Sequence, residues 1–342
     1  MSTPMGGGQF FLMLMKSQFF VKIPLPTSDF TGQTVIVTGS NTGLGLEAAR
    51  HLVRLGAAKV ILAVRSVDKG ERAAESILKS TEKTKNVIEV WQLDLGNYES
   101  IRAFGKRVGG LERLDAVIQN AGINTLEWST AEDNETTLTV NVVGAVLVGL
   151  LVLPKLRESG KKFGTKNRLT FVGSDLHYVG SVKEAKQAGS GSLFDALNKK
   201  QNRKLFDRYP TTKLLLLYAV REIARRSPVT PESPVIISCM TPGACKSDLM
   251  RDEIPKIVRI IIQSIMGLMM RSTEVGGGML VDAVRPDRGI EETHGAFLQD
   301  LKVFPNGPNV ESAKGQDLAK RFNEELFAKL ETISPGSTGV LQ

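Results

Sequence analysis

Short runs of β-branched residues alternate along this chain with longer amphipathic stretches, and this alternation constrains the fold more than any other feature. Most of the short runs are continuously apolar, as expected for strands that helices cover on both faces. A repeated strand–helix–strand order predicts an α/β fold with a doubly wound parallel sheet. The expected strands are Thr34–Thr38, Val60–Val64, Val87–Leu93, Ala116–Gln119, Leu169–Val172, Val235–Cys239 and one near Ala296–Leu298; the expected helices include Leu44–Leu55, Lys69–Ser80, Ser100–Val108, Glu135–Arg157 and Thr211–Arg226.

The alternating region predicts a single domain over residues 31–300, with an N-terminal extension (1–30) and a C-terminal helical extension (301–342). The first extension contains two apolar runs, each too short for a bilayer span of about 20 residues. It also lacks the basic start and cleavage site of a signal peptide. We expect a strap packed on the domain surface, with an anchor at a membrane interface as the alternative.

Two segments interrupt the alternation. Residues 179–206 are polar and rich in Gly and Ser, which predicts a long insertion. Residues 246–270 contain the Ile- and Met-rich run Ile254–Met270, which predicts a lid over a nonpolar ligand because Met adapts its shape. Burial as an ordinary core or dimer helix is an equally favoured interpretation of this run.

Charge and cysteine content limit the partners and the location. The 342 residues include 44 Lys and Arg against 36 Asp and Glu, a formal charge of +8. The two basic patches, Lys155–Arg168 and Lys199–Arg208, lack the interleaved aromatic residues of a nucleic-acid groove, so we expect solvated surfaces and no nucleic-acid partner. Two cysteines cannot build a disulfide framework, which favours a cytoplasmic location, and the three separated histidines predict no metal site.

A glycine-rich stretch follows the first expected strand and precedes the first expected helix. Glycines allow the backbone to turn sharply and approach a diphosphate, which the N–H groups at a helix start attract. The spacing is G-x-x-x-G-x-G, one residue longer than the common dinucleotide fingerprint. We expect a dinucleotide to contact Gly39, Asn41, Thr42, Gly43, Leu44 and Gly45.

This spacing resembles that of the short-chain dehydrogenase/reductase family, a family with a Rossmann fold. Four further motifs match in order: Asn120-Ala121-Gly122 after the fourth strand, a helical Asn141, Ser174 at the end of the fifth strand with Tyr209-Pro210-Thr211-Thr212-Lys213, and Pro242-Gly243 after the sixth. The sequence Ser174-Asp175-Leu176-His177 resembles the corresponding sequence in the retinol-dehydrogenase-like branch of the family, which includes many fungal reductases. The resemblance implies an oxidoreductase, with secondary metabolism as one setting.

Tyr209 is the only one of four tyrosines with Lys four residues later. Such spacing places both side chains on one helix face, where an ammonium lowers the pKa of a phenol. We expect Ser174 to hydrogen-bond the substrate oxygen and Tyr209 to pass it a proton. The resemblance implies that Lys213 also binds the nicotinamide ribose and that Asn141 holds a water for proton relay.

The end of the second expected strand indicates the cofactor. Sites that prefer NAD usually place Asp or Glu there, on the ribose 2′-hydroxyl. This chain has Arg65 instead, whose planar fork of donors suits a 2′-phosphate, so we expect NADP(H). Asp94-Leu95, after the third strand, resemble the adenine contact of the family.

The expected activity is hydride transfer between NADPH and a carbonyl or secondary alcohol of a lipophilic small molecule. A nucleotide-bound protein without redox chemistry (a sensor, scaffold or cyclase) and a membrane-associated dehydrogenase are the alternatives. Ser174 and Tyr209 are 35 positions apart, farther than in compact members, so residues 179–206 must loop out. The resemblance also implies a homodimer built on the helices that carry Asn141 and Tyr209.

Overall fold

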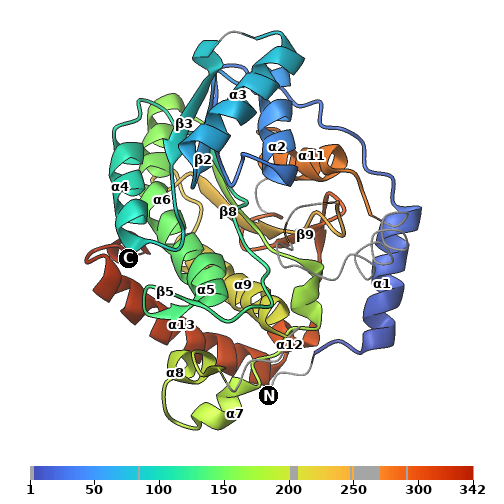
Figure 1. Ribbon diagram of the computed structural model, residues 1–342, viewed down its shortest axis with the longest axis vertical. Helices are drawn as coiled ribbons and strands as arrows, with labels where there is room; N and C mark the ends of the chain where they lie inside the picture. The colour runs from blue at the N-terminus through green and yellow to red at the C-terminus, as the bar shows by residue number, and fades with distance from the viewer. Residues whose placement is uncertain are drawn as a thin grey trace.

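The computed structural model describes residues 4–83, 85–200, 207–246, 249, 270–289 and 292–341. Its centre is an eight-stranded sheet in the order β10-β9-β8-β7-β4-β1-β2-β3, in which only the β9–β10 pair is antiparallel (Figure 1). The predicted doubly wound sheet is therefore confirmed. The strands are β1 (Thr34–Thr38), β2 (Lys59–Val64), β3 (Ile88–Gln92), β4 (Ala116–Gln119), β7 (Asn167–Val172), β8 (Val235–Met240), β9 (Phe297–Gln299) and β10 (Lys302–Phe304); β5 (Thr130–Ala131) and β6 (Asn134–Glu135) form a separate hairpin.

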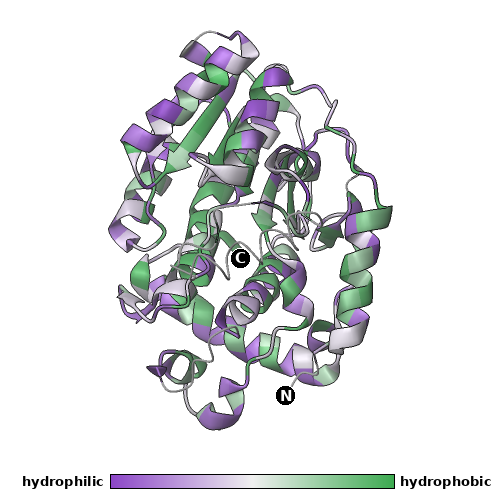
Figure 2. Cartoon of the chain, turned by 45° about the vertical axis from the view of Figure 1, so that its right-hand side comes forward, coloured by the Kyte–Doolittle hydropathy of each residue, from purple (hydrophilic) through white to green (hydrophobic). Residues whose placement is uncertain are grey.

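Helices cover both faces of this sheet (Figure 1). One core contains α2 (Gly43–Arg54), α3 (Val67–Thr81) and α11 (Thr273–Ala283). The opposite core contains α4 (Tyr98–Gly109), α6 (Ala145–Phe163), α9 (Arg208–Arg226) and α13 (Ala313–Ile333). Figure 2 shows hydrophobic strands between helices whose outer sides are hydrophilic. The remaining elements of the described residues are α1 (Gly7–Phe20), α5 (Thr136–Leu138), α7 (Glu184–Ala188), α8 (Leu193–Leu197), α12 (Pro308–Glu311), the π-helix η2 (Thr139–Gly144) and the 3-10 helices η1 (Lys85–Val87), η3 (Asp175–Tyr178) and η5 (Gly339–Leu341).

The strand order reverses at β1, which lies between β2 and β4. The helix after β1 packs on one face of the sheet and the helices after β4 pack on the other. In open α/β sheets, ligands bind at the carboxyl ends of the strands beside such a reversal. The turn after β1 and the loop after β4 therefore meet at one edge.

One apolar helical stretch, Thr136–Phe163, is long and hydrophobic enough to cross a membrane, judged on the described residues alone. Of its most apolar window, 83% is buried inside the protein. That environment is the one expected for the core helix of an α/β domain.

The predicted insertion contains more regular structure than its polar, Gly-rich sequence suggests. Its described part forms α7 and α8, and α8 packs on α13 through stacked rings of Phe194 and Phe322, 5.7 Å apart. The Glu325 carboxylate accepts hydrogen bonds from the backbone of α8. The described part of the segment thus contains two short helices, of which α8 is bonded to the C-terminal helix. Most of the predicted lid, residues 247, 248 and 250–269, lies outside the described residues.

Helix α13 bears on the predicted dimer. Its apolar side, which includes Leu318, Phe322 and Leu326, packs against α9. Buried residues occupy most positions of α9, and its exposed residues gather near its C-terminal end. The chain's own C-terminal helix therefore covers one side of α9.

Candidate active site

The turn between β1 and α2 needs glycine at two positions for steric reasons. A Cβ on Gly39 would lie 2.9 Å from the Cα of Ala121, and Gly39 has a φ of +65°. A Cβ on Gly45 would lie 2.5 Å from the Gly39 carbonyl oxygen. The first N–H groups of α2, which begins at Gly43, have no partners within the helix and suit an anion. The turn is therefore a cradle of the kind that a dinucleotide diphosphate fits.

The loop after β4 is fastened to this turn. The Asn120 side chain donates to the carbonyl oxygens of Thr38 (2.9 Å) and Gly39 (3.3 Å). The backbone N–H of Ala121 donates to the Thr38 hydroxyl at 2.9 Å. The predicted residues Asn41 and Thr42 lie in the turn itself, and Leu44 lies in the first turn of α2 and packs toward Gly276 of α11.

Two other predicted positions lie at neighbouring strand ends. Arg65 directly follows β2, is exposed, and forms no ion pair or hydrogen bond with any residue that the structure describes. Asp94 follows β3, where its Oδ1 accepts the Gly96 N–H at 2.9 Å, and the next residue, Leu95, is buried. Both positions lie on the same sheet edge as the glycine turn because β1, β2 and β3 run parallel.

Three proton-bearing side chains meet at this edge from two elements. Ser174 begins the turn after β7 and is hydrogen-bonded to Tyr209, in the first turn of α9. Lys213 lies one turn further along α9, with its Nζ 5.5 Å from the centre of the Tyr209 ring. The same Nζ donates to the Val172 carbonyl at 2.7 Å. The 35-residue separation in sequence is therefore no obstacle to a compact cluster.

Known proteins with related sequences place this arrangement in a family. The model of the short chain dehydrogenase family matches residues 33–175. The short chain dehydrogenase/reductase dmxR8 of Cryptosporiopsis sp. (strain 8999) is 42% identical over 325 residues, which cover 94% of this chain and 98% of that relative. The chain belongs to the short-chain dehydrogenase/reductase family. The short chain dehydrogenase atnD of Emericella nidulans is 41% identical over 286 residues, covering 83% of this chain and 89% of that protein.

Solved structures of short-chain dehydrogenases/reductases share the fold at low sequence identity. Pseudomonas aeruginosa RhlG in complex with NADP has a TM-score of 0.57 and 19% identity, covering 80% of this chain and 96% of that one. The 3-ketoacyl-(acyl-carrier-protein) reductase of Brucella melitensis, complexed with NADH, has a TM-score of 0.54 and 19% identity, covering 79% and 97%. The predicted family and Rossmann-type fold are thus confirmed, and the chain is an oxidoreductase of this family.

The pKa of the phenol differs from the expectation. Burial raises the pKa of Tyr209 above its ordinary value, and the hydrogen bond from Ser174 offsets only part of that effect. Burial lowers the pKa of the Lys213 ammonium to about 8. The predicted lowering of the phenol's pKa was therefore wrong, because desolvation outweighs the charge of a lysine that is bonded to the Val172 carbonyl.

Asn141 lies in the π-helical segment η2, where the helix is locally wider than an α-helix. Such segments often occur at functional sites. Its Oδ1 accepts the Ile123 N–H and its Nδ2 donates to the Ile123 carbonyl, both at 2.8 Å. The same Nδ2 donates to the Thr212 hydroxyl at 3.2 Å. Asn141 therefore joins the loop after β4 to α9, and a Cβ on Gly122 would come within 3.1 Å of its Oδ1.

Sequence reasoning missed three residues around this cluster. Thr212 lies inside the Tyr–Lys motif but was treated as a spacer. Asp175 is buried directly after Ser174, and burial raises its pKa to about 6 while the Thr241 hydroxyl bonds it. Arg271 donates to the Pro242 carbonyl at 3.3 Å, beside Gly243. The adjacency of Asp175 to Ser174 was the available signal; nothing in the sequence indicated Arg271.

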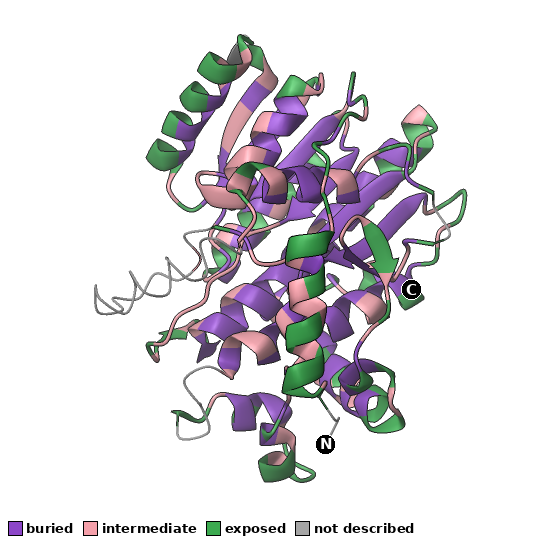
Figure 3. Ribbon diagram, turned by 90° about the vertical axis from the view of Figure 1, so that its right-hand side faces the viewer, coloured by how far each residue is buried: buried purple, intermediate pink, exposed green. Residues whose placement is uncertain are grey.

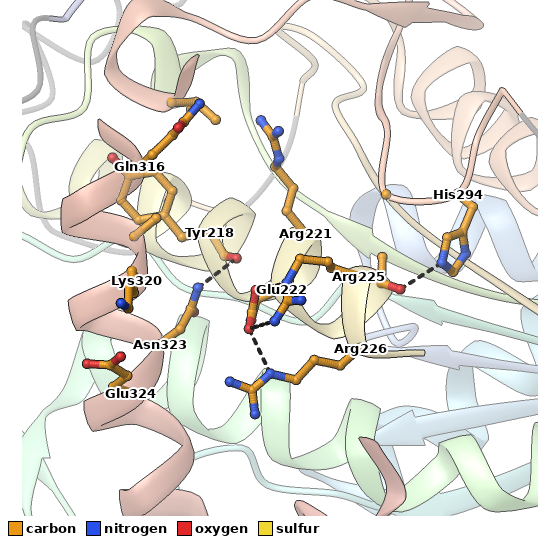
Figure 4. A pocket seen from close by; sticks show the side chains of 14 residues that line it. Tyr218, Arg221, Glu222, Arg225, Arg226, His294, Gln316, Lys320, Asn323 and Glu324 are labelled. Atoms are coloured by element: carbon orange, nitrogen blue, oxygen red, sulfur yellow. Dashed lines mark hydrogen bonds and ion pairs between the residues drawn. The ribbon is translucent and has the colours of Figure 1, made fainter. Parts of the chain in front are cut away.

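A separate hollow of about 660 Å³ lies between the C-terminal half of α9, α13 and the residues around His294 (Figure 4). Its arginines already have acidic partners: Glu222 binds both Arg225 and Arg226. Tyr209 and Lys213 lie at the other end of α9, so the hollow does not form part of the candidate active site.

Proposed function

We propose that this chain is an NADPH-dependent reductase that converts the carbonyl group of a largely apolar ketone or aldehyde into an alcohol. The observation that carries the proposal is the meeting of Ser174, Tyr209 and Lys213 beside a glycine turn that a dinucleotide fits. Fungal relatives such as dmxR8 are named as short chain dehydrogenases/reductases, which supports a related activity. We propose secondary metabolism as its setting.

The cofactor residues divide by the part of NADPH that each would hold. The glycine turn would hold the diphosphate through its N–H groups, Arg65 would bind the 2′-phosphate, and Asp94-Leu95 would contact the adenine. Asn120-Ala121-Gly122, Pro242-Gly243 and Lys213 are assigned to the nicotinamide riboside. When bound, NADPH supplies the hydride. The two residues directly after β2 are Arg65 and Ser66 and neither is acidic, which supports NADPH over NADH.

The chain's own residues would manage the proton and the carbonyl oxygen. Ser174 Oγ accepts the Leu176 N–H and donates its own proton to Tyr209, so Ser174 would turn this proton to the substrate oxygen when a substrate binds. A Tyr209 hydroxyl with a raised pKa stays protonated at neutral pH and can donate to an oxygen that becomes negative. Lys213, charged below about pH 8, then stabilises the phenolate that remains. Asn141 fixes the loop and α9 relative to each other, and its proposed water relay starts from that position.

A homodimer and a cytoplasmic location remain predictions. Because α13 covers part of α9, we propose that any dimer uses a surface other than the one that the family resemblance implied.

The decisive experiment follows NADPH absorbance with a panel of lipophilic ketones and aldehydes. We expect wild-type turnover, and loss of turnover in Tyr209→Phe with NADPH affinity retained. Tyr218→Phe is the matched control, because it removes a hydroxyl from the same helix whose hydrogen-bond acceptor is the Asn309 carbonyl. NADPH binding without oxidation by any member of the panel would favour the non-redox alternative.

A further inference from the structure

Helix α1 presents large apolar side chains to solvent. Phe11 is 54% exposed, Leu12 70%, Phe19 51% and Phe20 81%. Only three other large apolar side chains in the described part of the chain are exposed, each less than these four, and one of them, Leu25, follows this helix closely. Figure 3 shows α1 on the outside of the molecule, with its exposed positions facing the viewer. Such a concentrated apolar surface indicates a binding face.

The exposure does not come from a detached helix, because both ends of α1 are fixed. At the start, the Met5 N–H donates to the Tyr178 carbonyl at 2.8 Å, and Phe10 and Met13 pack on the core. Near the end, Ser17 is buried and its hydroxyl donates to Asp300 at 2.8 Å. The outer face therefore has a defined orientation.

A buried ion pair stabilises the contact between Ser17, near the end of α1, and Asp300. Arg271 donates to Asp300 at 2.7 Å and to the Ser17 carbonyl at 2.9 Å. Asp300 and Leu301 form the two-residue turn between β9 and β10, both with positive φ (50° and 64°). A leucine in the left-handed region persists only where its surroundings hold it, and the ion pair beside it supplies such a constraint.

These attachments place α1 beside the candidate active site. Tyr178 ends the turn that Ser174 begins, so the start of α1 lies against the Ser174 turn. At the other end, a Cβ on Gly243 would meet the Gln18 amide at 2.6 Å, and Arg271 also bonds the Pro242 carbonyl. Helix α1 thus runs from the Ser174 turn to the Pro242-Gly243 turn.

We propose that the outer face of α1 binds the surface of a lipid bilayer that contains anionic headgroups. Residues 1–28 include Lys16 and Lys22 and no Asp or Glu. Both lysines are exposed, and a lysine within an apolar helix face can extend its ammonium to the headgroups while its stem stays in the apolar layer. In a symmetric contact between two copies, the same face would meet itself and bring the Lys16 charges together, which disfavours that occupant.

The function of this contact rests on the proposed reductase activity. A lipophilic ketone concentrates in the bilayer, and α1 would hold the Ser174 and Pro242-Gly243 turns next to that reservoir. Binding to the bilayer itself requires no catalysis, so the two ideas can fail separately.

The test is co-sedimentation with phosphatidylcholine vesicles, with and without phosphatidylserine. We expect the wild-type protein to sediment with the anionic vesicles and less so at high salt. The double variant L12S/F20S should bind at least about tenfold more weakly, because its two most exposed apolar side chains are lost. Lys16→Glu should weaken binding to the anionic vesicles only. Val67→Ser is the control, since Val67 is exposed on α3, outside this face.

Circular dichroism and NADPH binding establish that each variant is folded. Vesicles should raise kcat/KM for a lipophilic ketone in the wild type but not in L12S/F20S, with a water-soluble ketone unaffected. The proposal is overturned if the wild type stays in the supernatant with both vesicles, or if L12S/F20S sediments like the wild type. It is also overturned if size-exclusion chromatography shows a dimer that L12S/F20S dissociates, because a second copy is then the occupant.

Discussion

Replacing Arg65 by alanine separates the contribution of the 2′-phosphate from the rest of NADPH binding. Arg65 is exposed directly after β2 and has no ion pair or hydrogen bond with other residues in the described ranges, so its loss breaks no internal contact there. A hydrogen bond between charged groups contributes about 1.5–3 kcal/mol. At about 1.4 kcal/mol per tenfold, Arg65→Ala should raise the Kd for NADPH about 10- to 150-fold.

The assay is titration of NADPH and NADH into the wild type, Arg65→Ala and the control Arg72→Ala. Arg72 is exposed on α3, so its substitution removes the same charge at a more distant position. We expect the Kd for NADH to change little in every protein. High salt should reduce the discrimination by the wild type. An unchanged ratio of the two dissociation constants in Arg65→Ala would refute the assignment of Arg65 to the 2′-phosphate.

Two further predictions concern the glycine turn and the buried carboxyl. Gly45→Ala should weaken NADPH binding and lower the free energy of unfolding in urea by about 1–3 kcal/mol, because its Cβ would overlap the Gly39 carbonyl oxygen. Gly109→Ala is the control, because a Cβ at Gly109 meets no atom within 4 Å. Equal effects of the two substitutions would contradict the steric argument. The pKa of Asp175 is about 6 in the folded protein, raised by burial from 3.8. Between pH 4 and pH 6 the folded state therefore binds more protons than the unfolded state, and the free energy of unfolding falls with rising pH by up to about 3 kcal/mol through this group. Asp175→Asn should remove that fall, and an unchanged pH profile would show that Asp175 is not its source.

The sequence predicted the sheet and the position of the site because both depend on local patterns. Continuous apolar runs mark strands that are buried on both faces, and β1, β4 and β8 begin and end within a residue or two of the predicted bounds. Parallel strands bring their carboxyl ends to one edge. Motifs that follow different strands, such as Gly39 and Asn120, are therefore neighbours in the fold.

Helix α11 was not predicted, because its three consecutive glycines are unfavourable in a helix. The structure explains them by close contact with α2: a Cβ on Gly276 would lie 2.5 Å from the Leu44 side chain, and one on Gly277 would lie 2.7 Å from the Ala48 nitrogen. Tertiary packing thus selects residues that local propensity disfavours.

Contacts between distant segments were also out of reach of the sequence. Ser17, Arg271 and Asp300 form one buried cluster although they lie up to 283 positions apart. The raised pKa of Tyr209 has the same origin, because the helix spacing showed the neighbouring lysine but not the extent of burial.

The central proposal is that Tyr209 donates a proton to the carbonyl oxygen while NADPH transfers a hydride to the carbonyl carbon. The most direct measurement uses NADPH deuterated at either face of the nicotinamide C4 and mass spectrometry of the alcohol formed from lipophilic ketones. The account predicts deuterium at the carbinol carbon from one face only, with the rate in Tyr209→Phe lower by about 10²- to 10⁴-fold and NADPH affinity unchanged. Product without deuterium from either face, or transfer in Tyr209→Phe at the wild-type rate, would contradict it.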